Sequence, residues 1–565
     1  MISAISGFIE AVNYGVWSWP SYPMPWMVLS LLGVGLYLTF RMGFINIRAF
    51  WHSIQIVSGK YDDPSETGDI SHFQALTTAL SATVGVGNIA GVAMAIHYGG
   101  PGALFWMWVT AFLGMSTKFA ECTLATTFRV TNDDGSVSGG PMYYIELGMG
   151  KAWRPMAFFF AACTSISAFG SGNASQAHTL ADAMYSAFRM PTWMSGALSA
   201  TLLALVVIGG IKRIGQITSR VIPAMTAIYV LSSLAILFMR AGAIPSAFAT
   251  IVSSAFSPHA AISGFVGSTF LYMLTWGVKR GLFSNEAGQG SAPIAHAAAR
   301  TDIPVREGIV ALLEPFIDTL TICTLTGLVI VTTGVWKDQV QDSYPLTEQS
   351  AISFMRANCD VQVDGIVTED CVAKPGRYPI SNGRIEALSA IKNDAIVTGA
   401  MLQVDGQPIQ SGFLDISSAG VAHVSTGLAR TGEVDGHVTL AGKYTLNGEP
   451  LTARAFHIGL APLFPGGEYI ITFCIFLFAL STAIGWSYYG ERGVQYLFGD
   501  RAIIPYRFVF VAVHFIGSVI SLETVWAFSD ISMGLMAVPN LSALIWLSNR
   551  IARDTKTYMT TRHVG

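Results

Sequence analysis

The sequence predicts an all-α polytopic membrane protein that carries a small β-rich outer domain. Of its 565 residues 52% are hydrophobic and only 12% are charged, and the mean hydropathy is +0.50. Soluble proteins carry roughly 25% charged residues, so a soluble globular fold is excluded. About 20 apolar residues suffice to cross a bilayer. Eleven apolar stretches are long enough, at about 24–41, 73–97, 101–124, 155–187, 192–210, 221–240, 263–298, 308–335, 467–489, 504–521 and 525–548.

The chain divides into four regions along this pattern. Residues 1–72 hold an interfacial helix (1–20), the first span and an inner loop, and the first twenty residues contain no Lys or Arg, which argues against a secretory signal. Residues 73–335 hold the first seven spans of a ten-helix core. Residues 336–465 interrupt the core, and residues 466–565 supply its last three spans and a cytoplasmic tail.

Basic residues fix the expected orientation. With the N-terminus outside, eighteen Lys and Arg residues fall on inner segments, against Arg189 and Arg240 on short outer ends. Cytoplasmic loops carry this excess of positive charge. We therefore expect a plasma membrane protein, in a bacterium the inner membrane, with its C-terminus in the cytoplasm. The net charge of −3 gives no reason to expect a nucleic-acid partner.

The polar interruption, 336–465, is expected on the outer side. It contains fourteen acidic and nine basic residues, with Asp405-Gly406 and Asn447-Gly448 between short alternating runs, a pattern typical of β-hairpins. Cys359 and Cys371 lie within it, and two cysteines in an oxidising compartment predict a disulfide. The other four cysteines (Cys122, Cys163, Cys323 and Cys474) fall inside spans, where we expect them to pack as small apolar residues.

The span 73–97 is unusual at its centre. Gly85 and Gly87 loosen the backbone there, and Thr83 and Asn88 place polar side chains at mid-depth. One interpretation is a close helix crossing that uses glycine for packing. The other is a discontinuous helix that forms a substrate or ion site.

The span 263–298 is interrupted as well. Its glycines bracket Lys279, Arg280 and Glu286, and charges at this depth are costly. They either form a structural salt bridge or contact the substrate. Because the two interrupted spans are numbers one and six of the ten core helices, their spacing favours a five-plus-five inverted repeat.

Three stretches carry a resemblance to a known family. GGPGALFWMWVTAFLG (99–114), GLFSNEAGQGSAP (281–293) and FALSTAIGWSYYGERG (478–493) are similar to signature stretches of the alanine or glycine:cation symporter family. The resemblance implies the amino acid:sodium symporter fold, with broken first and sixth core helices and an extra N-terminal helix. It also implies Na⁺ as the coupling ion, no organic cofactor, and uptake of small neutral amino acids. The expected partners are the amino acid and membrane lipid, and a monomer would be sufficient.

The resemblance and the residue chemistry together nominate a site. The carboxylate of an amino acid substrate would face the helix N-terminus near Asn88. The ammonium of the same amino acid would face carbonyls of an unwound Gly281–Ser284. The substrate candidates are Thr83, Gly85, Gly87, Asn88, Gln176, Gly281, Phe283, Thr482 and Trp486. By resemblance to the sodium site of the fold, the ion would take the carbonyls of Ser81 and Val84 and the hydroxyls of Ser481 and Thr482.

The polar residues of the spans also bear on other functions. Glu121 lies in the third span and Glu314 and Asp318 in the eighth, and the last two, at helical spacing, leave a proton-coupled symporter as the alternative. An enzyme is not expected, since the spans show no nucleophile–base or metal-binding pattern. Two isolated helix breaks do not supply the continuous polar stripe of a channel. His514, alone on its span, is expected to be a hydrogen-bonded structural residue.

Overall fold

The computed structural model describes residues 11–561 apart from 18, 21–24, 134, 257–269, 347–351, 357–372, 386–387, 393–394, 417–421, 426–437 and 521–522. The helices of the first half are α2 (Trp26–Arg41), α3 (Ile45–Arg48), α4 (Phe50–Val57), α5 (His72–Thr83), α6 (Val92–Gly99), α7 (Gly102–Thr127), α8 (Pro141–Tyr143), α9 (Arg154–Phe169), α10 (Ser175–Phe188), α11 (Thr192–Val207), α12 (Gly210–Met239) and α13 (Ile244–Ser254). Those of the second half are α14 (Phe270–Asn285), α15 (Ala292–His296), α16 (Pro304–Ala311), α17 (Leu313–Pro315), α18 (Thr324–Thr333), α19 (Gly448–Leu460), α20 (Glu468–Phe498), α21 (Ile503–Val519) and α22 (Glu523–Thr561).

Local signals explain several helix ends. Ser71 and Gln74 form a capping box at the start of α5, which satisfies two backbone donors that the first turn leaves free. Proline stands in the first turn of α9, α13, α15 and α16, where its missing N–H costs nothing. Gly334 and Gly499, both with positive φ, end α18 and α20.

The helices form a polytopic membrane protein. Among the described residues six helical stretches are long and apolar enough to cross a membrane, and the bent pair α5–α6 makes a seventh candidate. The other four predicted spans correspond to two 16-residue helices (α2 and α11), to α7, which carries Lys118 and Glu121, and to the interrupted pair α14–α15. Eleven spans and the inverted repeat remain predictions.

The strands gather in one lobe, which we call the strand unit (residues 339–445). It contains β3 (Gln339–Pro345), β4 (Ile352–Arg356), β5 (Gly376–Ser381), β6 (Arg384–Ile385), β7 (Leu388–Lys392), β8 (Ala395–Ile396), β9 (Thr398–Val404), β10 (Gln407–Pro408), β11 (Ser411–Ile416), β12 (Ala422–Ser425) and β13 (Val438–Thr445). They form three antiparallel sheets, ordered β10-β9-β13-β3, β12-β11-β5-β6 and β4-β7-β8, around a separate small apolar core. A further short hairpin, β1 (Val130–Thr131) and β2 (Val137–Ser138), lies outside this unit.

One hairpin prediction is confirmed and the other is wrong. Asp405 and Gly406 both have positive φ and join β9 to β10, as a two-residue turn requires. Asn447-Gly448 instead begins α19, so the strands end at Thr445 and not near residue 465. Helix α19 packs on α18, α20 and the helical segment of the first break, as part of the helical body. Cys359 and Cys371 lie outside the described residues, so their disulfide stays a prediction.

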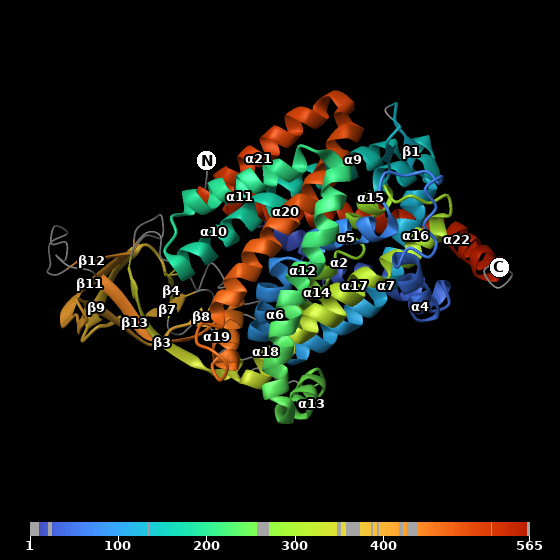
Figure 1. Ribbon diagram of the computed structural model, residues 1–565. Helices are drawn as coiled ribbons and strands as arrows, with labels where there is room; N and C mark the ends of the chain where they lie inside the picture. The colour runs from blue at the N-terminus through green and yellow to red at the C-terminus, as the bar shows by residue number, and fades with distance from the viewer. Residues whose placement is uncertain are drawn as a thin grey trace.

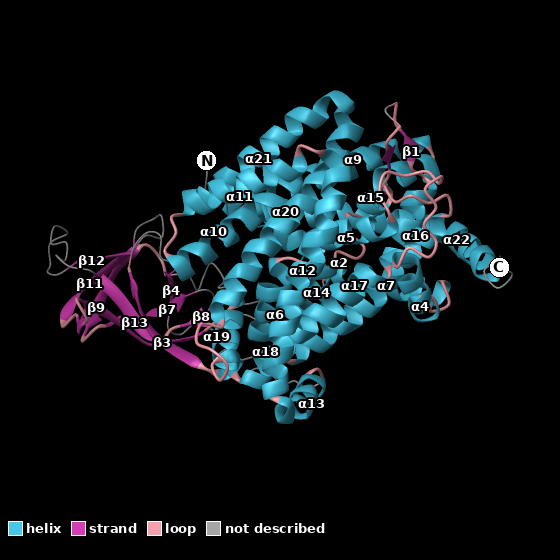
Figure 2. Ribbon diagram, viewed as in Figure 1, coloured by secondary structure: helices cyan, strands magenta, loops and turns pink. Residues whose placement is uncertain are grey.

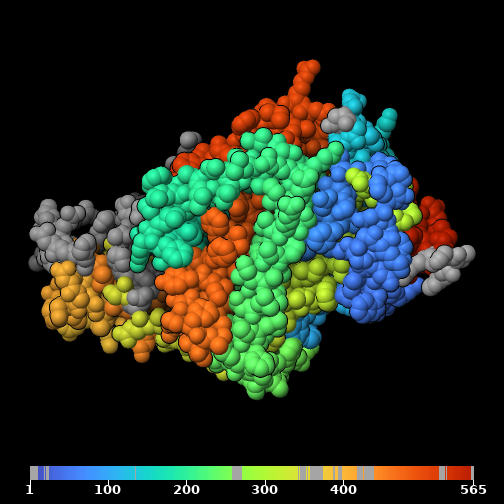
Figure 3. Space-filling view, viewed as in Figure 1, coloured from blue at the N-terminus to red at the C-terminus, as the bar shows by residue number. Residues whose placement is uncertain are grey.

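The strand unit and the chain's C-terminal helix lie at opposite ends of the molecule. Figure 1 shows the strand unit at one end and α4, α16, the β1 hairpin and the end of α22 at the other, with the long helices between them. Figure 2 shows the same division by secondary structure, and in Figure 3 the strand unit projects from the helical body as a lobe. This arrangement fits the predicted orientation, in which these two ends face opposite sides of the membrane.

Candidate functional site

The first helix break lies where the sequence predicts it. Helix α5 ends at Thr83, Val84 is extended, and a π-helical turn (Gly87–Gly91) leads into α6 at a bend of 56°. The Asn88 side chain repairs the interruption, because its Oδ1 accepts the Gly85 N–H at 2.8 Å. The side chain that repairs the break is itself fully buried.

The two glycines of the break have different roles. A Cβ on Gly85 would overlap Thr482 Oγ1 of α20, so glycine lets α20 come close to the broken backbone. Gly87 is exposed, and a Cβ there would have open space on every side within 4 Å. Gly85 is thus needed for helix packing, whereas helix packing does not require glycine at position 87.

The second break lies later in the chain than predicted. Helix α14 continues through Gly281 to Asn285, so the expected unwinding of Gly281–Ser284 is wrong. Chain direction changes over residues 286–291, where Glu286, Gly288 and Gly290 have φ of 55°, 91° and 83°. A Cβ on Gly281 would lie 3.3 Å from Met107 Cα and 3.2 Å from Thr110 Cβ of α7, so this glycine serves helix packing.

Buried side chains hold the second break in place. The Glu286 carboxylate accepts hydrogen bonds from Ser291 Oγ and, at 3.1 Å, from Trp486 Nε1 of α20. Glu121 of α7 accepts the Gly288 N–H at 3.1 Å. Lys279 and Arg280 lie with their charged ends over the Trp276 ring. Among these groups Glu286 is the one that links the second break to α20.

Asn88 also joins the two breaks through a polar cluster. Its Nδ2 donates to Asp318 Oδ1 at 2.6 Å and to Ser284 Oγ at 3.1 Å. Asp318 Oδ2 accepts from Ser284 Oγ at 2.6 Å and from Thr319 Oγ1 at 2.7 Å. All four side chains are buried, so Asp318 anchors the first break, α14 and the helix that follows α17 at one point.

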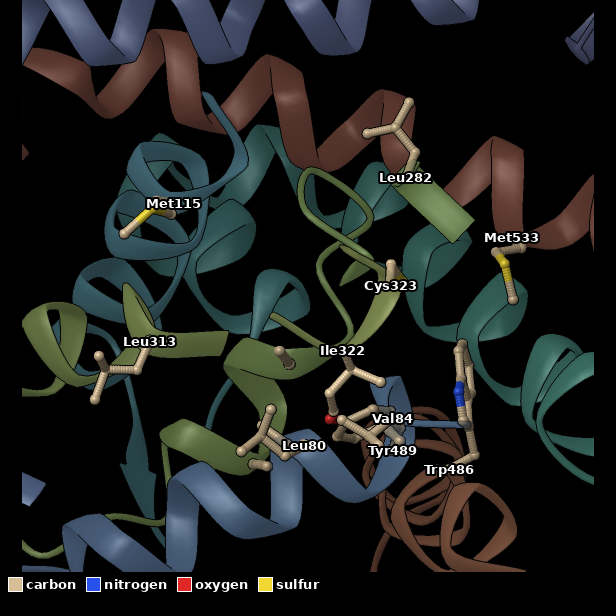
Figure 4. Close-up of a cluster of buried hydrophobic side chains, with 14 of the residues drawn as sticks. Leu80, Val84, Met115, Leu282, Leu313, Ile322, Cys323, Trp486, Tyr489 and Met533 are labelled. Atoms are coloured by element: carbon tan, nitrogen blue, oxygen red, sulfur yellow. The ribbon is translucent and has the colours of Figure 1, made fainter. Parts of the chain in front are cut away.

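The residues nominated for sodium are brought together. Ser481 Oγ donates to the Ser81 carbonyl at 3.3 Å, and Thr482 lies against Gly85, one residue after Val84. Thr482 Oγ1 is buried and has no hydrogen-bond partner among the described residues. A buried hydroxyl without a partner costs free energy, so this oxygen suits a ligand. Figure 4 shows Val84 of the break with Trp486 and Tyr489 of α20 in the surrounding buried cluster.

Two of the nominated substrate residues face the same region. The Trp486 ring packs on Gly172 so closely that a Cβ there would overlap it. Gln176 Nε2 donates to the Ser171 carbonyl at 3.1 Å, while its Oε1 is buried without a partner among the described residues. Thr83 and Phe283 are turned to other neighbours: Thr83 Oγ1 donates to its own helix at Ala79, and the Phe283 ring lies 4.9 Å from that of Trp17.

Some functional contacts were missed by sequence reasoning. Gly172 beside Trp486 and Ser284 beside Asp318 are long-range contacts that no local pattern indicates. His72, His296 and Glu307 form a buried ion cluster, and titratable residues inside apolar spans were the available signal. His514 was predicted correctly, since its ring bonds Asn173 Oδ1 at 2.7 Å and Ser199 Oγ at 3.1 Å.

Two interrupted helices joined at a buried polar site, against a third helix that offers hydroxyl oxygens, define a class of protein: the membrane transporters whose substrate sites are built at helix breaks. Comparison with known proteins gives the family. The chain matches the sodium:alanine symporter family over residues 3–363 and 428–565. It belongs to that family.

Curated relatives cover most of the chain. The sodium/alanine symporter AgcS of Methanococcus maripaludis is 37% identical over 555 residues, which cover 97% of this chain and 96% of that protein. The putative sodium/proton-dependent alanine carrier protein YrbD of Bacillus subtilis is 37% identical over 345 residues, or 61% of this chain and 68% of that protein. The probable sodium/glutamine symporter GlnT of Bacillus subtilis is 28% identical over 540 residues, covering 95% and 89%.

Proposed function

We propose that the protein is a sodium-coupled symporter that imports small neutral amino acids, such as alanine and glycine, by alternating access. The observation that carries the proposal is the meeting of α20 with the first break. There the Ser481 and Thr482 hydroxyls lie against Ser81 and Gly85, and Thr482 Oγ1 has no partner among the described residues. An apolar packing contact would not need paired hydroxyls at this point.

The sodium ion would be held by oxygens alone. Unwound carbonyls and the C-terminal ends of half-helices coordinate Na⁺ in transporters of this kind. The C-terminal end of α5 supplies the Ser81 and Val84 carbonyls, and α20 supplies the two hydroxyls. Because Ser481 Oγ now donates to the Ser81 carbonyl, its hydrogen would rotate away to offer a lone pair to the ion.

The amino acid would lie between the two breaks. Its carboxylate would face the N–H groups of the half-helix that begins at Gly87, where the helix dipole also favours an anion. Its ammonium would face carbonyls of the second break, residues 286–291. Trp486, held by Glu286 and backed by Gly172, would leave room for a small side chain only.

Closure of the outer side is supported by α19. Thr452 Oγ1 of α19 donates to the Ile89 carbonyl in the first break at 3.0 Å, and Asn447 Nδ2 donates to Tyr98 Oη at 3.0 Å. Alternating access requires such contacts to break when the outer side opens. With the N-terminus outside and the C-terminus in the cytoplasm, import across the plasma membrane would proceed from the α19 end toward the α5 end.

Uptake of labelled alanine into proteoliposomes tests the function directly. An inward sodium gradient should drive alanine accumulation, and a proton gradient of equal size without sodium should not. Competition by unlabelled glycine should be strong and competition by leucine weak. Accumulation driven by protons alone would instead support the alternative, a proton-coupled symporter.

Proton coupling through Glu314 and Asp318 has less support than sodium coupling. Glu314 accepts from Lys118 Nζ at 3.3 Å, and Asp318 already accepts from Asn88, Ser284 and Thr319. Both carboxylates therefore already have donor partners on other helices, which is the arrangement expected of structural groups.

A further inference from the structure

Five buried ionisable side chains form a second polar site, which we call the histidine–carboxylate cluster. Its members are His72 of α5, Lys118 of α7, His296 of α15, Glu307 of α16 and Glu314 of α17. Each of these side chains is 0% exposed. None of them belongs to the proposed sodium or substrate site. Five charges or potential charges in the interior are costly unless they are paired, so their placement calls for a role.

Glu307 is the centre of the cluster. One carboxylate oxygen contacts His72 Nδ1, and the other contacts His296 Nδ1 at 2.5 Å. The second nitrogen of His296 faces Glu314 Oε2 at 3.7 Å, and Glu314 Oε1 accepts from Lys118 Nζ at 3.3 Å. A nitrogen–oxygen contact this close needs a hydrogen between the atoms, so each histidine presents Nδ1–H to Glu307.

The charges balance only if the cluster holds one extra proton. Within the five residues, two carboxylates and the single ammonium of Lys118 sum to one negative charge when both histidines are neutral. One imidazolium makes the sum zero, and a buried site disfavours any other sum. Histidine is the side chain that ordinarily changes charge between pH 5 and pH 8, so this proton can exchange in the physiological range once water reaches it.

The surroundings contain other charges whose partners are accounted for. On α7 the neighbouring Glu121 is bonded to Asn540 and Gly288, and Cys122 is buried. Arg129, after α7, donates to carbonyls at 297, 299, 301 and 67. On α16 itself Arg306 pairs with Glu66, and on α4 His52 bonds Tyr558 of α22. Glu286, bonded to Ser291 and Trp486, and Asp318, bonded to Asn88, Ser284 and Thr319, also lie near Lys118 and Glu314. These groups set the background field, and the two histidines supply the proton.

The cluster joins one half of each broken helix, and these two halves lie on the same side of the helical body. Helix α5 precedes the first break and α15 follows the second, and the chain before α5 runs beside the chain after α15, with an Ile70–Ala299 bridge and a 2.9 Å bond from Asp69 N–H to the Ala298 carbonyl. Through His72 and His296, Glu307 fixes both halves to α16. In the proposed orientation these are the halves that close the cytoplasmic side.

We propose that the histidine–carboxylate cluster is a proton-binding latch on the inner gate. With one imidazolium in place, Glu307 holds α5 and α15 against α16 by charge-assisted hydrogen bonds, and the inner side stays closed. Loss of that proton to an alkaline cytoplasm weakens both contacts and favours inner opening. The direction of opening rests on the proposed function and orientation, whereas the proton site rests on the cluster's geometry.

The test uses a reporter cysteine, so that it does not depend on transport. Ala75 is 0% exposed and lies one helical turn after His72, so Ala75→Cys reacts with a membrane-impermeant maleimide only when α5 leaves its neighbours. Inside-out vesicles without sodium or amino acid are labelled between about pH 6 and about pH 8, the range in which histidine titrates. Rates are divided by those of Thr557→Cys, an exposed site on α22, to remove the pH dependence of the thiol itself.

The rate ratio should rise roughly three- to tenfold across this range, as the imidazolium of the cluster loses its proton. Adding Glu307→Gln should give a high ratio that no longer changes with pH. His514→Asn, which removes a buried histidine elsewhere, should keep the original pH dependence. A ratio that does not change with pH in the Ala75→Cys protein, including an absence of labelling, overturns the proposal. So does an unchanged pH dependence in Glu307→Gln.

Failure of the proposed orientation gives a different result. Labelling that occurs only in right-side-out vesicles would place α5 on the outer side. The pH dependence would then be measured from that side. A labelling ratio that changes with pH would support the latch, and a constant ratio would overturn it, whatever the direction of transport.

Discussion

Thr482 and Gly85 determine how closely α20 approaches the first break. Any side chain at position 85 would push α20 away, and the Thr482 hydroxyl would then lose its place at the broken backbone. The same contact leaves Thr482 Oγ1 buried without a partner among the described residues. An unsatisfied hydroxyl of this kind costs about 1–3 kcal/mol, which a bound ion would recover.

Ser481→Ala should weaken sodium binding while leaving the fold intact. Loss of one oxygen ligand should raise the sodium concentration for half-maximal alanine binding by roughly five- to 150-fold, equivalent to about 1–3 kcal/mol. Very high sodium should restore alanine affinity, since ion and substrate binding are reciprocally linked. Ser487→Ala is a matched control, because Ser487 lies on the same helix and donates to its own Ile484 carbonyl. An unchanged sodium midpoint in Ser481→Ala would remove α20 from the ion site.

Gly172→Ala should block the pocket by displacing Trp486. The added methyl overlaps the indole, which must then move toward the breaks, so alanine binding should fall at least about tenfold, the effect of 1.4 kcal/mol. Trp486→Ala should admit leucine, and it should restore alanine binding to Gly172→Ala. Binding assays on the two single variants and the double variant measure this coupling. If the changes in the free energy of alanine binding caused by the two substitutions simply add, the Trp486 indole does not line the pocket.

Local sequence chemistry predicted the residues of the first break but not their partners. Two glycines and an asparagine inside an apolar run are visible in the sequence, and the structure places the break at those residues. The cluster around Glu307 was not predictable, because His72 and Glu307 are 235 positions apart and only the fold brings them together. The same is true of Trp486 and Glu286, which are 200 positions apart.

At the scale of the element, the positions of glycines in the sequence predicted the second break too early in the chain. Gly281 was expected to begin an unwound segment, yet Gly277 and Gly281 both lie inside α14, where a Cβ would meet the backbone of α7. Glycine in a membrane helix serves close packing as often as flexibility, and a sequence does not separate the two. Helix α19 was missed for a related reason: Asn-Gly is a strong hairpin signal, and here it begins a helix.

Helix α19 carries a carboxyl whose protonation should affect its docking. Burial, followed by the nearby Asp182 charge, raises the pKa of Glu449 to about 7. A carboxyl with a raised pKa in the folded state contributes stability below its ordinary pKa, about 4.3 for Glu, and loses that contribution as pH rises through 7. The purified protein should therefore lose thermal stability between about pH 5 and about pH 8 relative to Glu449→Gln.

Melting temperatures of the two proteins across this range would measure the effect. Asp182→Asn should make the loss of stability smaller, because it removes the repulsive neighbour. Parallel melting curves for wild type and Glu449→Gln at every pH would show that α19 docks independently of this carboxyl.

At the scale of the whole molecule, the two ends of the helical body face different compartments in the predicted orientation. Cys359 and Cys371, on the strand-unit side, should then be joined in a disulfide, since that side permits oxidation. In intact cells neither thiol should react with a membrane-impermeant maleimide until a reductant is added. Labelling of both thiols without reductant would contradict the pairing.

The strand unit enters and leaves the helical body at one place. Its first strand, β3, pairs antiparallel with its last, β13, from Gln339 opposite Thr445 to Pro345 opposite Thr439. The ends of the unit are therefore side by side whatever lies between them, and chain can be gained or lost there without moving α18 or α19. The match to the family is interrupted between residues 363 and 428, which is inside the segment that the paired strands β3 and β13 enclose. Evolution could resize the lobe freely, and a fluorescent protein or an affinity tag could be grafted between these two strands.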